Sequence, residues 1–197
     1  KALIAAGTGL GESILFYDGK THVPFATEGG HCSFAPTNDL EISLLQYAKS
    51  KFNSHISVER LVSGAFGFST IFEFLCKHYN YHSPILQKIK ISENPAPVIY
   101  EEAENGDELA IRSIQLFLKL YAQEASNLAL KSFAVGGVYL GGGIINKLLK
   151  YINPNEFMQA FCNKGRFEEL LSQIPIKIIK DHNNAIKGAA FYGLIKS

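Results

Sequence analysis

The stretch TEGGHCSFAP, from Thr27 to Pro36, places a carboxylate and an imidazole three residues apart across two glycines. Glycine allows the backbone to approach a ligand closely, so Glu28 and His31 can present their side chains to one point. A carboxylate accepts hydrogen bonds from neighbouring hydroxyl groups, and an imidazole adds a further donor or acceptor. This chemistry suits a sugar. For His31 alone, a turn histidine whose hydrogen bonds are satisfied within the protein is the simpler interpretation.

A second carboxylate with matching chemistry is Glu59, in the stretch SVERLVSG. The sequence alone does not bring Glu59 close to Glu28 and His31. The simpler interpretation of Glu59 is an acid in the first turn of a helix, where the positive end of the helix dipole favours a negative charge. A sugar site would require the three side chains to meet.

Two glycine clusters offer sites for an anion or a flat ring. Gly7, Thr8 and Gly9 follow the apolar run ALIAA, and successive backbone N–H groups in such a turn can form a nest for phosphate. Their spacing matches neither a P-loop nor a dinucleotide fingerprint, so a plain tight turn is the alternative. Gly141 and Gly142, in LGGGI, separate a buried strand from a helix. That cluster fits either a nucleotide ring lying against bare backbone or close packing of the helix on the strand.

Composition limits the classes of function. The 197 residues are 47% hydrophobic, which is enough for a full core. The net charge of +1 gives no basic surface for nucleic acid, and no apolar run approaches the roughly 20 residues of a membrane helix. The three cysteines are far apart and show no metal-ligand spacing. We therefore expect a cytoplasmic protein with reduced thiols, no metal site, and neither nucleic acid nor membrane as a partner.

Apolar runs separated by turn residues predict strands alternating with helices, the pattern of an α/β domain. Three strands in a meander are expected at 2–6, 13–18 and 21–28, and two further strands at 138–140 and 174–180. A helix capped by Asn38 is expected to bury Ile42, Leu45 and Ala48. Further helices are expected in two segments of 59–79 divided at Ser63 and Gly64, over 107–131, from residue 145, and over 183–196.

The long helix over 107–131 has the clearest apolar periodicity, and its face suits either a central core position or a dimer contact. Residues 80–106 contain Pro84, Pro95 and Pro97 and are predicted to be a loop-rich excursion with one short helix.

In chain order, the motifs GTGLG, EGGHxxFAP, ERLVSG, GGVYLGGGI and FxxKGRF resemble those of the bacterial glucokinase family. The resemblance covers essentially the whole chain. It implies the actin/hexokinase/Hsp70 fold, a three-layer ribonuclease-H-like domain with a mixed sheet. The related ROK kinases carry a cysteine-rich zinc motif after the analogous histidine; this chain has none and therefore resembles the non-ROK branch.

The resemblance also implies roles for individual residues. Glu28, His31 and Glu59 match sugar-binding positions. The first glycine cluster, Gly7, Thr8 and Gly9, matches a phosphate-binding loop, and the second, Gly141 and Gly142, matches an adenosine-binding turn. The implied activity is ATP-dependent phosphorylation of glucose to glucose 6-phosphate, with Mg²⁺ bridging the phosphates.

Two family features are absent: the DxGGTN phosphate hairpin, and an Asn-Asp pair before the glycine loop, which supplies the general base in the family. Asn38-Asp39 follows the EGGH motif instead and is better explained as a helix cap. We therefore expect residues 1–197 to be the C-terminal lobe of a two-lobed kinase, inactive alone and partnered by its own N-terminal lobe. No catalytic residue or metal ligand is assigned within it. Expected partners are glucose and ATP or ADP, and a homodimer is possible. The alternatives are a non-catalytic sugar-responsive regulator on the same fold and a kinase for another hexose.

Overall fold

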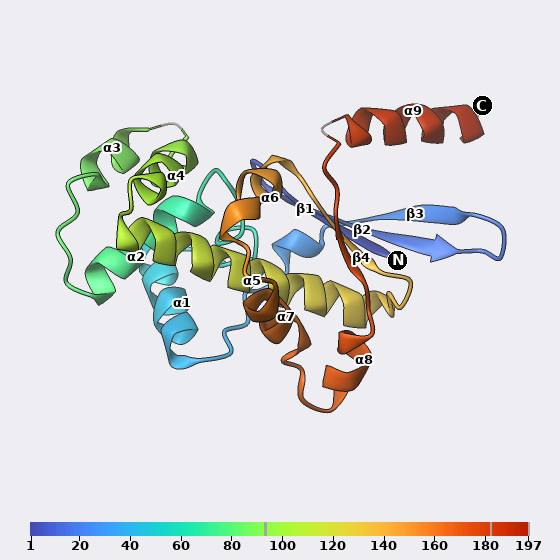
Figure 1. The fold of residues 1–197 in the computed structure, drawn as a ribbon, viewed down its shortest axis with the longest axis horizontal. Helices are drawn as coiled ribbons and strands as arrows, with labels where there is room; N and C mark the ends of the chain where they lie inside the picture. Colours follow the sequence, from blue (N-terminus) through green and yellow to red (C-terminus); the bar gives the residue numbers. More distant parts are fainter. Residues whose placement is uncertain (93, 182, 197) are drawn as a thin grey trace.

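The computed structural model describes residues 1–92, 94–181 and 183–196. Its centre is a five-stranded mixed sheet with the strand order β3-β2-β1-β4-β5 (Figure 1). The strands are β1 (Ala2–Ala6), β2 (Leu10–Tyr17), β3 (His22–Thr27), β4 (Val138–Gly141) and β5 (Ile176–Ile178). The α/β class, the mixed sheet and the three-stranded meander are confirmed.

The register of the central strands decides where the glycine clusters lie. β1 pairs with β4 in parallel, from Ala2 opposite Val138 to Ala5 opposite Gly141. Both strands therefore end at the same edge of the sheet, the edge at which α/β proteins bind ligands. β5 continues the parallel pairing beyond β4, whereas β2 and β3 are antiparallel.

β3 is an edge strand, and Pro24 lies in its middle opposite Leu15. The Leu15 N–H donates to the Lys1 carbonyl, and the Leu15 carbonyl accepts from the Lys1 amino group, so both face β1. In an antiparallel ladder the partner of such a residue turns its backbone away. Pro24, which has no N–H, therefore faces the open edge, where proline is tolerated.

The helix α5 (Glu108–Ser132) is the centre of the core and is buried along most of its length. Asp107 caps it by accepting a hydrogen bond from the Ala110 N–H at 2.7 Å. On its sheet side the Tyr121 hydroxyl donates to the Ile4 carbonyl of β1 at 2.8 Å. On another side its Phe117 ring stacks on Phe68, with 4.1 Å between ring centroids. The core interpretation of this helix is confirmed; a homodimer remains a prediction.

Three expectations about helices are wrong. In α1 (Asp39–Phe52), Leu44 and Ala48 are buried, but Ile42 is 44% exposed and Glu41 is fully buried. The apolar face is rotated because polar partners draw Glu41 into the core. Over 59–79 only one regular helix forms, α2 (Gly67–His78).

The first predicted segment of 59–79 is a series of turns instead. Its backbone N–H groups bond outside a helix: Gly64 donates to the Gly7 carbonyl at 2.8 Å, and Ala65 donates to the Thr8 carbonyl at 3.3 Å. Tertiary pairing with the first glycine cluster thus replaces the helical ladder.

Residues 80–106 contain two helices instead of one, α3 (Leu86–Ile91) and α4 (Ala96–Glu104). Pro95 and Pro97 lie at the start of α4, where a missing N–H breaks no helical hydrogen bond. These prolines begin a helix, whereas their presence in the sequence favoured a loop-rich excursion.

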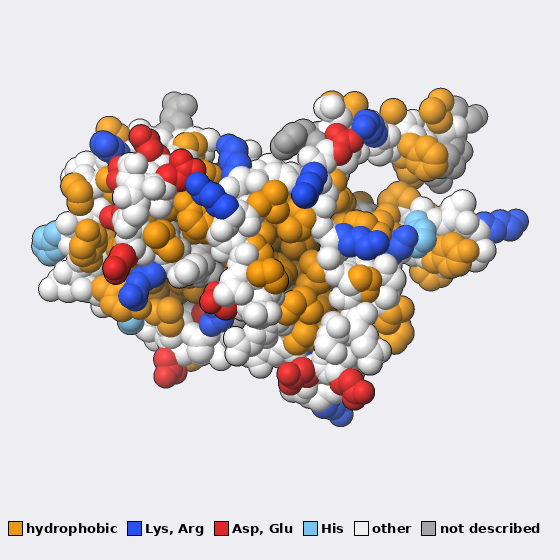
Figure 2. Space-filling model, in the orientation of Figure 1, with side chains coloured by type: hydrophobic (Ala, Val, Ile, Leu, Met, Phe, Trp, Pro, Cys, Tyr) orange, Lys and Arg blue, Asp and Glu red, His pale blue; other side chains and the backbone are white. Residues whose placement is uncertain are grey.

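The remaining helices follow the second glycine cluster. They are α6 (Gly143–Lys147), α7 (Pro154–Cys162), α8 (Glu168–Ser172) and α9 (Asn184–Lys196). Figure 2 shows hydrophobic side chains gathered on the β2–β3 hairpin and on α9, where Phe16, Phe25 and Phe191 are each more than 60% exposed. Among the described residues, no helix combines the length and apolar character that spanning a membrane requires.

Candidate functional site

Glu59 lies against the first glycine cluster. One of its carboxylate oxygens, Oε2, accepts a hydrogen bond from the Leu10 N–H at 2.9 Å. A Cβ atom at Gly9 would lie 2.5 Å from the same oxygen, so only glycine fits there without displacing Glu59. Because Glu59 lies in a turn and the next helix, α2, begins only at Gly67, the interpretation of Glu59 as a first-turn helix acid is wrong.

His31 approaches the other oxygen of the same carboxylate. Its Nε2 atom lies 3.7 Å from Glu59 Oε1, with the imidazole 61% exposed. The backbone fixes this approach, because the Glu59 N–H donates to the Gly30 carbonyl at 2.9 Å and the Val58 N–H donates to the Cys32 carbonyl at 3.0 Å. These backbone hydrogen bonds join the EGGH turn to the segment that carries Glu59, and they bring the side chains of His31 and Glu59 together.

Glu28 precedes the short 3₁₀ turn Gly29–His31, and its carbonyl accepts a hydrogen bond from the His31 N–H at 3.0 Å. The Glu28 side chain is exposed and makes no capping hydrogen bond to the turn. Glu28 and His31 therefore belong to one rigid turn.

The first glycine cluster forms a tight turn. The Gly7 N–H donates to the Gly9 carbonyl at 2.8 Å and is used within the loop. The Gly7 carbonyl accepts from Gly64, while Thr8 is exposed at the tip. The loop is therefore anchored from below by the segment that carries Glu59.

The second glycine cluster lies beside the first. Gly142 has a φ of +89°, and a Cβ atom there would lie 2.1 Å from the Ala6 carbonyl oxygen. A Cβ atom at Gly64 would lie 3.3 Å from Ile144 Cδ1 of α6. Gly141 is buried within β4. Close packing, one of the two interpretations of LGGGI, is therefore present, and it brings the two glycine clusters together at one edge of the sheet.

Comparison with known proteins identifies the family of the chain. The family profile described as glucokinase matches residues 1–194. The chain belongs to the glucokinase family. A curated glucokinase from Nostoc sp. is 40% identical over 203 residues, a match that covers 96% of this chain and 59% of that protein. The chain thus spans less than two thirds of the length of this relative.

Solved structures show the same fold. A glucokinase from an Antarctic psychrotroph has a TM-score of 0.84 at 26% identity, covering 96% of this chain and 56% of the other. A glucokinase from Balamuthia mandrillaris, solved in complex with glucose, has a TM-score of 0.76 at 22% identity, covering 90% and 49%. The second likeness concerns the fold alone.

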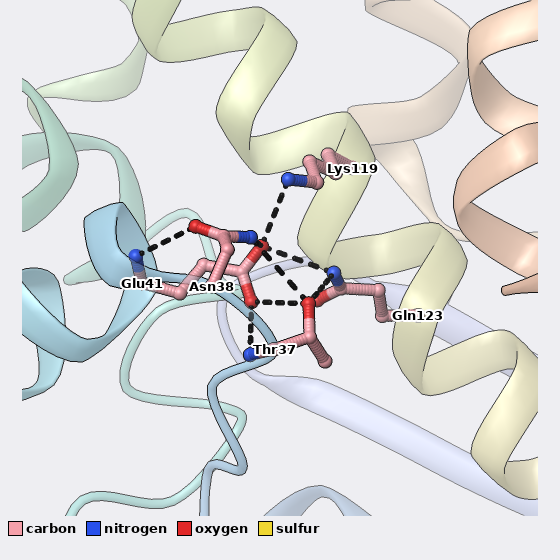
Figure 3. A network of polar contacts seen from close by, with 5 residues as sticks. All are labelled: Thr37, Asn38, Glu41, Lys119 and Gln123. Carbon is pink, nitrogen blue, oxygen red and sulfur yellow. Dashed lines mark hydrogen bonds and ion pairs between the residues drawn. The ribbon is translucent and has the colours of Figure 1, made fainter. Parts of the chain in front are cut away.

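A polar cluster joins the start of α1 to α5 in this glucokinase-family chain (Figure 3). The buried Glu41 carboxylate accepts hydrogen bonds from the Thr37 N–H at 2.7 Å, the Asn38 amide at 2.6 Å and the Gln123 amide at 3.0 Å. The Lys119 ammonium lies 3.0 Å from the same carboxylate. The network fastens the chain after the EGGH turn to α5.

Burial alone would raise the pKa of Glu41. The hydrogen bonds from Thr37, Gln123 and Lys119 together outweigh burial, so that the pKa of this carboxyl is below its ordinary value. This network was not predicted from the sequence, although the spacing of Asn38 and Glu41 is that of a capping box and is a signal for it.

A second missed residue is Glu12, which lies beneath the EGGH turn. It is 7% exposed, and a Cβ atom at Gly29 would lie only 1.9 Å from its Oε2 atom. The alternation Leu10, Glu12, Ile14 along β2 places Glu12 on the inward face of the sheet, which is the signal that could have found it.

A pocket of this glucokinase-family chain lies away from the predicted site residues. A space of about 690 Å³ lies among α2, α5 and α7, and its lining includes Leu75, Arg112, Lys119 and Phe157. None of the predicted site residues lines this cavity. In the part of the chain that the structure describes, no group of three or more acidic, histidine or cysteine side chains is placed to hold a metal ion.

Proposed function

We propose that this chain is the sugar- and nucleotide-binding part of a glucokinase, which transfers the γ-phosphoryl group of ATP to the 6-hydroxyl of glucose. The observation that carries the proposal is the meeting of His31 and Glu59 beside two adjacent glycine clusters. The side chains of His31 and Glu59 suit a sugar, and the glycine clusters suit a phosphate. Membership of the glucokinase family supports both assignments.

In this proposal, Glu28, His31 and Glu59 bind the sugar hydroxyls. The Oε2 atom of Glu59 is held by Leu10, so Oε1 and the imidazole of His31 are the groups available to a ligand. A carboxylate anchored at one oxygen presents the other in a fixed direction, which reduces the entropy lost when the sugar binds.

The phosphates of ATP are proposed to lie at the first glycine cluster. Because the Gly7 N–H is engaged within the turn, the exposed Thr8 and the Gly9 backbone are the groups proposed to contact phosphate. The adenosine is proposed to lie at Gly141 and Gly142, where the adjacent parallel strand ends.

Phosphoryl transfer depends mainly on positioning and charge stabilisation, with Mg²⁺ neutralising the phosphates when bound. We assign neither a general base nor a magnesium ligand to residues 1–197. Because loss of a general base alone lowers a rate by about 10²–10⁴, residues 1–197 by themselves are expected to be inactive. The free cysteines suit a reducing compartment, and we place the enzyme in the cytoplasm.

The test compares the full-length protein with residues 1–197 in a coupled assay of ADP release. We expect glucose-dependent turnover from the full-length protein and none from residues 1–197. A panel containing mannose and glucosamine separates glucokinase from a kinase for another hexose. If the full-length protein binds sugar without turnover, a regulator on the same fold replaces this proposal.

A further inference from the structure

Two buried carboxyl groups meet beneath the EGGH turn. Glu12 of β2 is 7% exposed and Glu124 of α5 is 3% exposed, and their side chains lie within hydrogen-bonding reach of each other. The Oε1 atom of each is buried and has no hydrogen-bond donor among the described residues. A single proton placed between the two groups would supply the missing donor, because a protonated carboxyl can donate to a carboxylate.

The charges around the pair show which carboxyl holds the proton. The Asn127 amide donates to Glu124 Oε2 at 2.9 Å, and the Lys131 ammonium lies 3.8 Å from Glu124 Oε1. The Lys164 ammonium binds Asn127 Oδ1 at 2.7 Å and adds a second positive charge on the same side. The carboxylate is therefore stabilised at Glu124, and Glu12 is the protonated partner.

The directions in which the environment shifts the pKa values of the two carboxyls agree with this assignment. Burial, followed by the charge of Glu124, raises the pKa of Glu12 to about 7, and Lys131 opposes the rise. Burial also raises the pKa of Glu124, although Asn127, Lys131 and Lys164 oppose the rise. The Tyr121 hydroxyl on α5 is a further titratable group near Glu12, and burial raises its pKa well above the neutral range.

The same carboxyl contacts the turn that carries Glu28 and His31. Glu12 Oε2 occupies the space where a side chain at Gly29 would begin. The Thr27 hydroxyl donates to the Glu12 carbonyl at 3.1 Å and accepts from the Gly29 N–H at 3.2 Å. Movement of the Glu12 side chain would therefore displace the turn directly.

We propose that Glu12 is a positioning residue that shares one proton with Glu124 and thereby holds the EGGH turn in the shape that binds sugar. The role of the turn rests on the proposed function. When the proton leaves for solvent, two carboxylates face each other in a buried site, and their repulsion moves Glu12 toward Gly29. Sugar binding should therefore weaken as the pH rises through the titration of Glu12.

The test uses the full-length protein with Glu12→Gln, whose amide donates a hydrogen bond to Glu124 at every pH. The exposed Glu101→Gln is the matched control. For the wild type and the control we expect the glucose KM to rise about tenfold between pH 6 and pH 8.5, which corresponds to a pKa difference of about one unit between the free and sugar-bound protein. We expect kcat to change much less.

For Glu12→Gln we expect a KM close to that of the wild type at pH 6 and little change up to pH 8.5. The proposal is overturned if Glu12→Gln keeps the pH slope of the wild type, or if its KM is raised equally at every pH. If Glu12→Gln does not fold, Glu124→Gln provides the second test. Its amide would stabilise ionised Glu12, so the midpoint of the KM profile should move to lower pH, and an unchanged midpoint overturns the proposal.

A measurement without sugar separates this proposal from the proposed function. In ¹³C NMR of the unliganded protein, the Glu12 carboxyl carbon should titrate near pH 7, and the Gly29 amide signal should follow the same midpoint. Titration of Glu12 near its ordinary value, or a Gly29 signal that does not respond, overturns the positioning role. Absence of turnover with glucose would overturn the proposed function and leave the NMR result to decide the positioning role.

Discussion

The side chain of Glu59 is bonded to the backbone of Leu10 across 49 positions of the sequence. Because Leu10 immediately follows the first glycine cluster, this bond joins the candidate sugar-binding carboxylate to the candidate phosphate loop. Any shift of one is transmitted to the other.

Glu59→Gln separates charge from shape at this junction. The amide oxygen can still accept from the Leu10 N–H, so the fold should survive and the melting temperature should change little. Loss of the charge facing His31 and the sugar should raise the glucose KM of the full-length enzyme by about tenfold or more, since hydrogen bonds to charged groups contribute about 1.5–3 kcal/mol. The KM for ATP should change little. Equal rises in both constants would show that Glu59 is structural.

Substitution of Gly29 by alanine should be partly rescued by a second substitution at Glu12, whereas substitution of Gly30 should not. A methyl group at Gly29 meets the side chain of Glu12, whereas one at Gly30 meets the backbone carbonyl of Leu10 at 2.3 Å. Gly29→Ala and Gly30→Ala should both lower the melting temperature and weaken sugar binding. Adding Glu12→Ala should restore part of the melting temperature of Gly29→Ala and none of that of Gly30→Ala. Rescue of both variants, or of neither, would contradict the contact.

Gly142→Ala should be strongly destabilising. The new methyl group would meet the Ala6 carbonyl, and the backbone has the positive φ that side chains disfavour, at a cost of about 1–3 kcal/mol for the strain alone. Gly143→Ala is the control, because nothing lies within 4 Å of its Cβ position and α6 begins there. In urea unfolding, the free energy of unfolding should fall for Gly142→Ala and should change by no more than about 1 kcal/mol for Gly143→Ala. Similar losses for the two would refute the close approach.

Glu41 should make stability depend on acid pH. Its lowered pKa means that the unfolded chain binds the proton more tightly. The contribution of Glu41 is therefore complete above the unfolded pKa of about 4.3, and it is lost as the pH falls through the lower folded value. At pH 7, Glu41→Gln should destabilise the protein by about 1.5–3 kcal/mol.

The expected magnitude for Glu41→Gln stays below that of a fully buried ion pair because Lys119 is 43% exposed. The difference in unfolding free energy between Glu41→Gln and the wild type should narrow as the pH falls below about 4. Lys51, which pairs with Glu73 at the surface, offers a control: Lys51→Met should give a small and nearly constant difference over the same range. A constant difference for Glu41→Gln as well would contradict the lowered pKa.

Local patterns predicted most of the fold. Alternating apolar residues located the strands, and the cap at Asp107 located α5. Two of the errors, at Glu41 and over 59–66, have one physical source, since each involves a polar group satisfied by a distant partner. The third, over 80–106, arose from prolines that begin a helix. Gly64 and Ala65 leave the helical pattern to bond Gly7 and Thr8. The residues that form these two hydrogen bonds lie far apart in the sequence, so local patterns cannot predict them.

The sequence predicted which residues form the candidate site, and the structure adds the hydrogen bonds that bring them together. EGGH and ERLVSG indicated sugar chemistry, but their meeting depends on the backbone bond from Glu59 to Gly30. The carboxyl beneath the turn was missed because a glutamate in a hairpin is usually exposed. Its partner Glu124 lies more than a hundred residues away, on a helix interpreted by its apolar face alone.

Pro24 has a consequence for the protein's solubility. It stands on the open edge of β3, close in the fold to the exposed rings of Phe16 and Phe25. An unprotected edge beside apolar rings is a template on which another chain can add a strand and begin aggregation. Because Pro24 has no N–H, it interrupts the row of backbone donors to which another strand could pair. Replacing it by a residue with an N–H, as in Pro24→Val, would leave the folded sheet intact and favour ordered self-assembly.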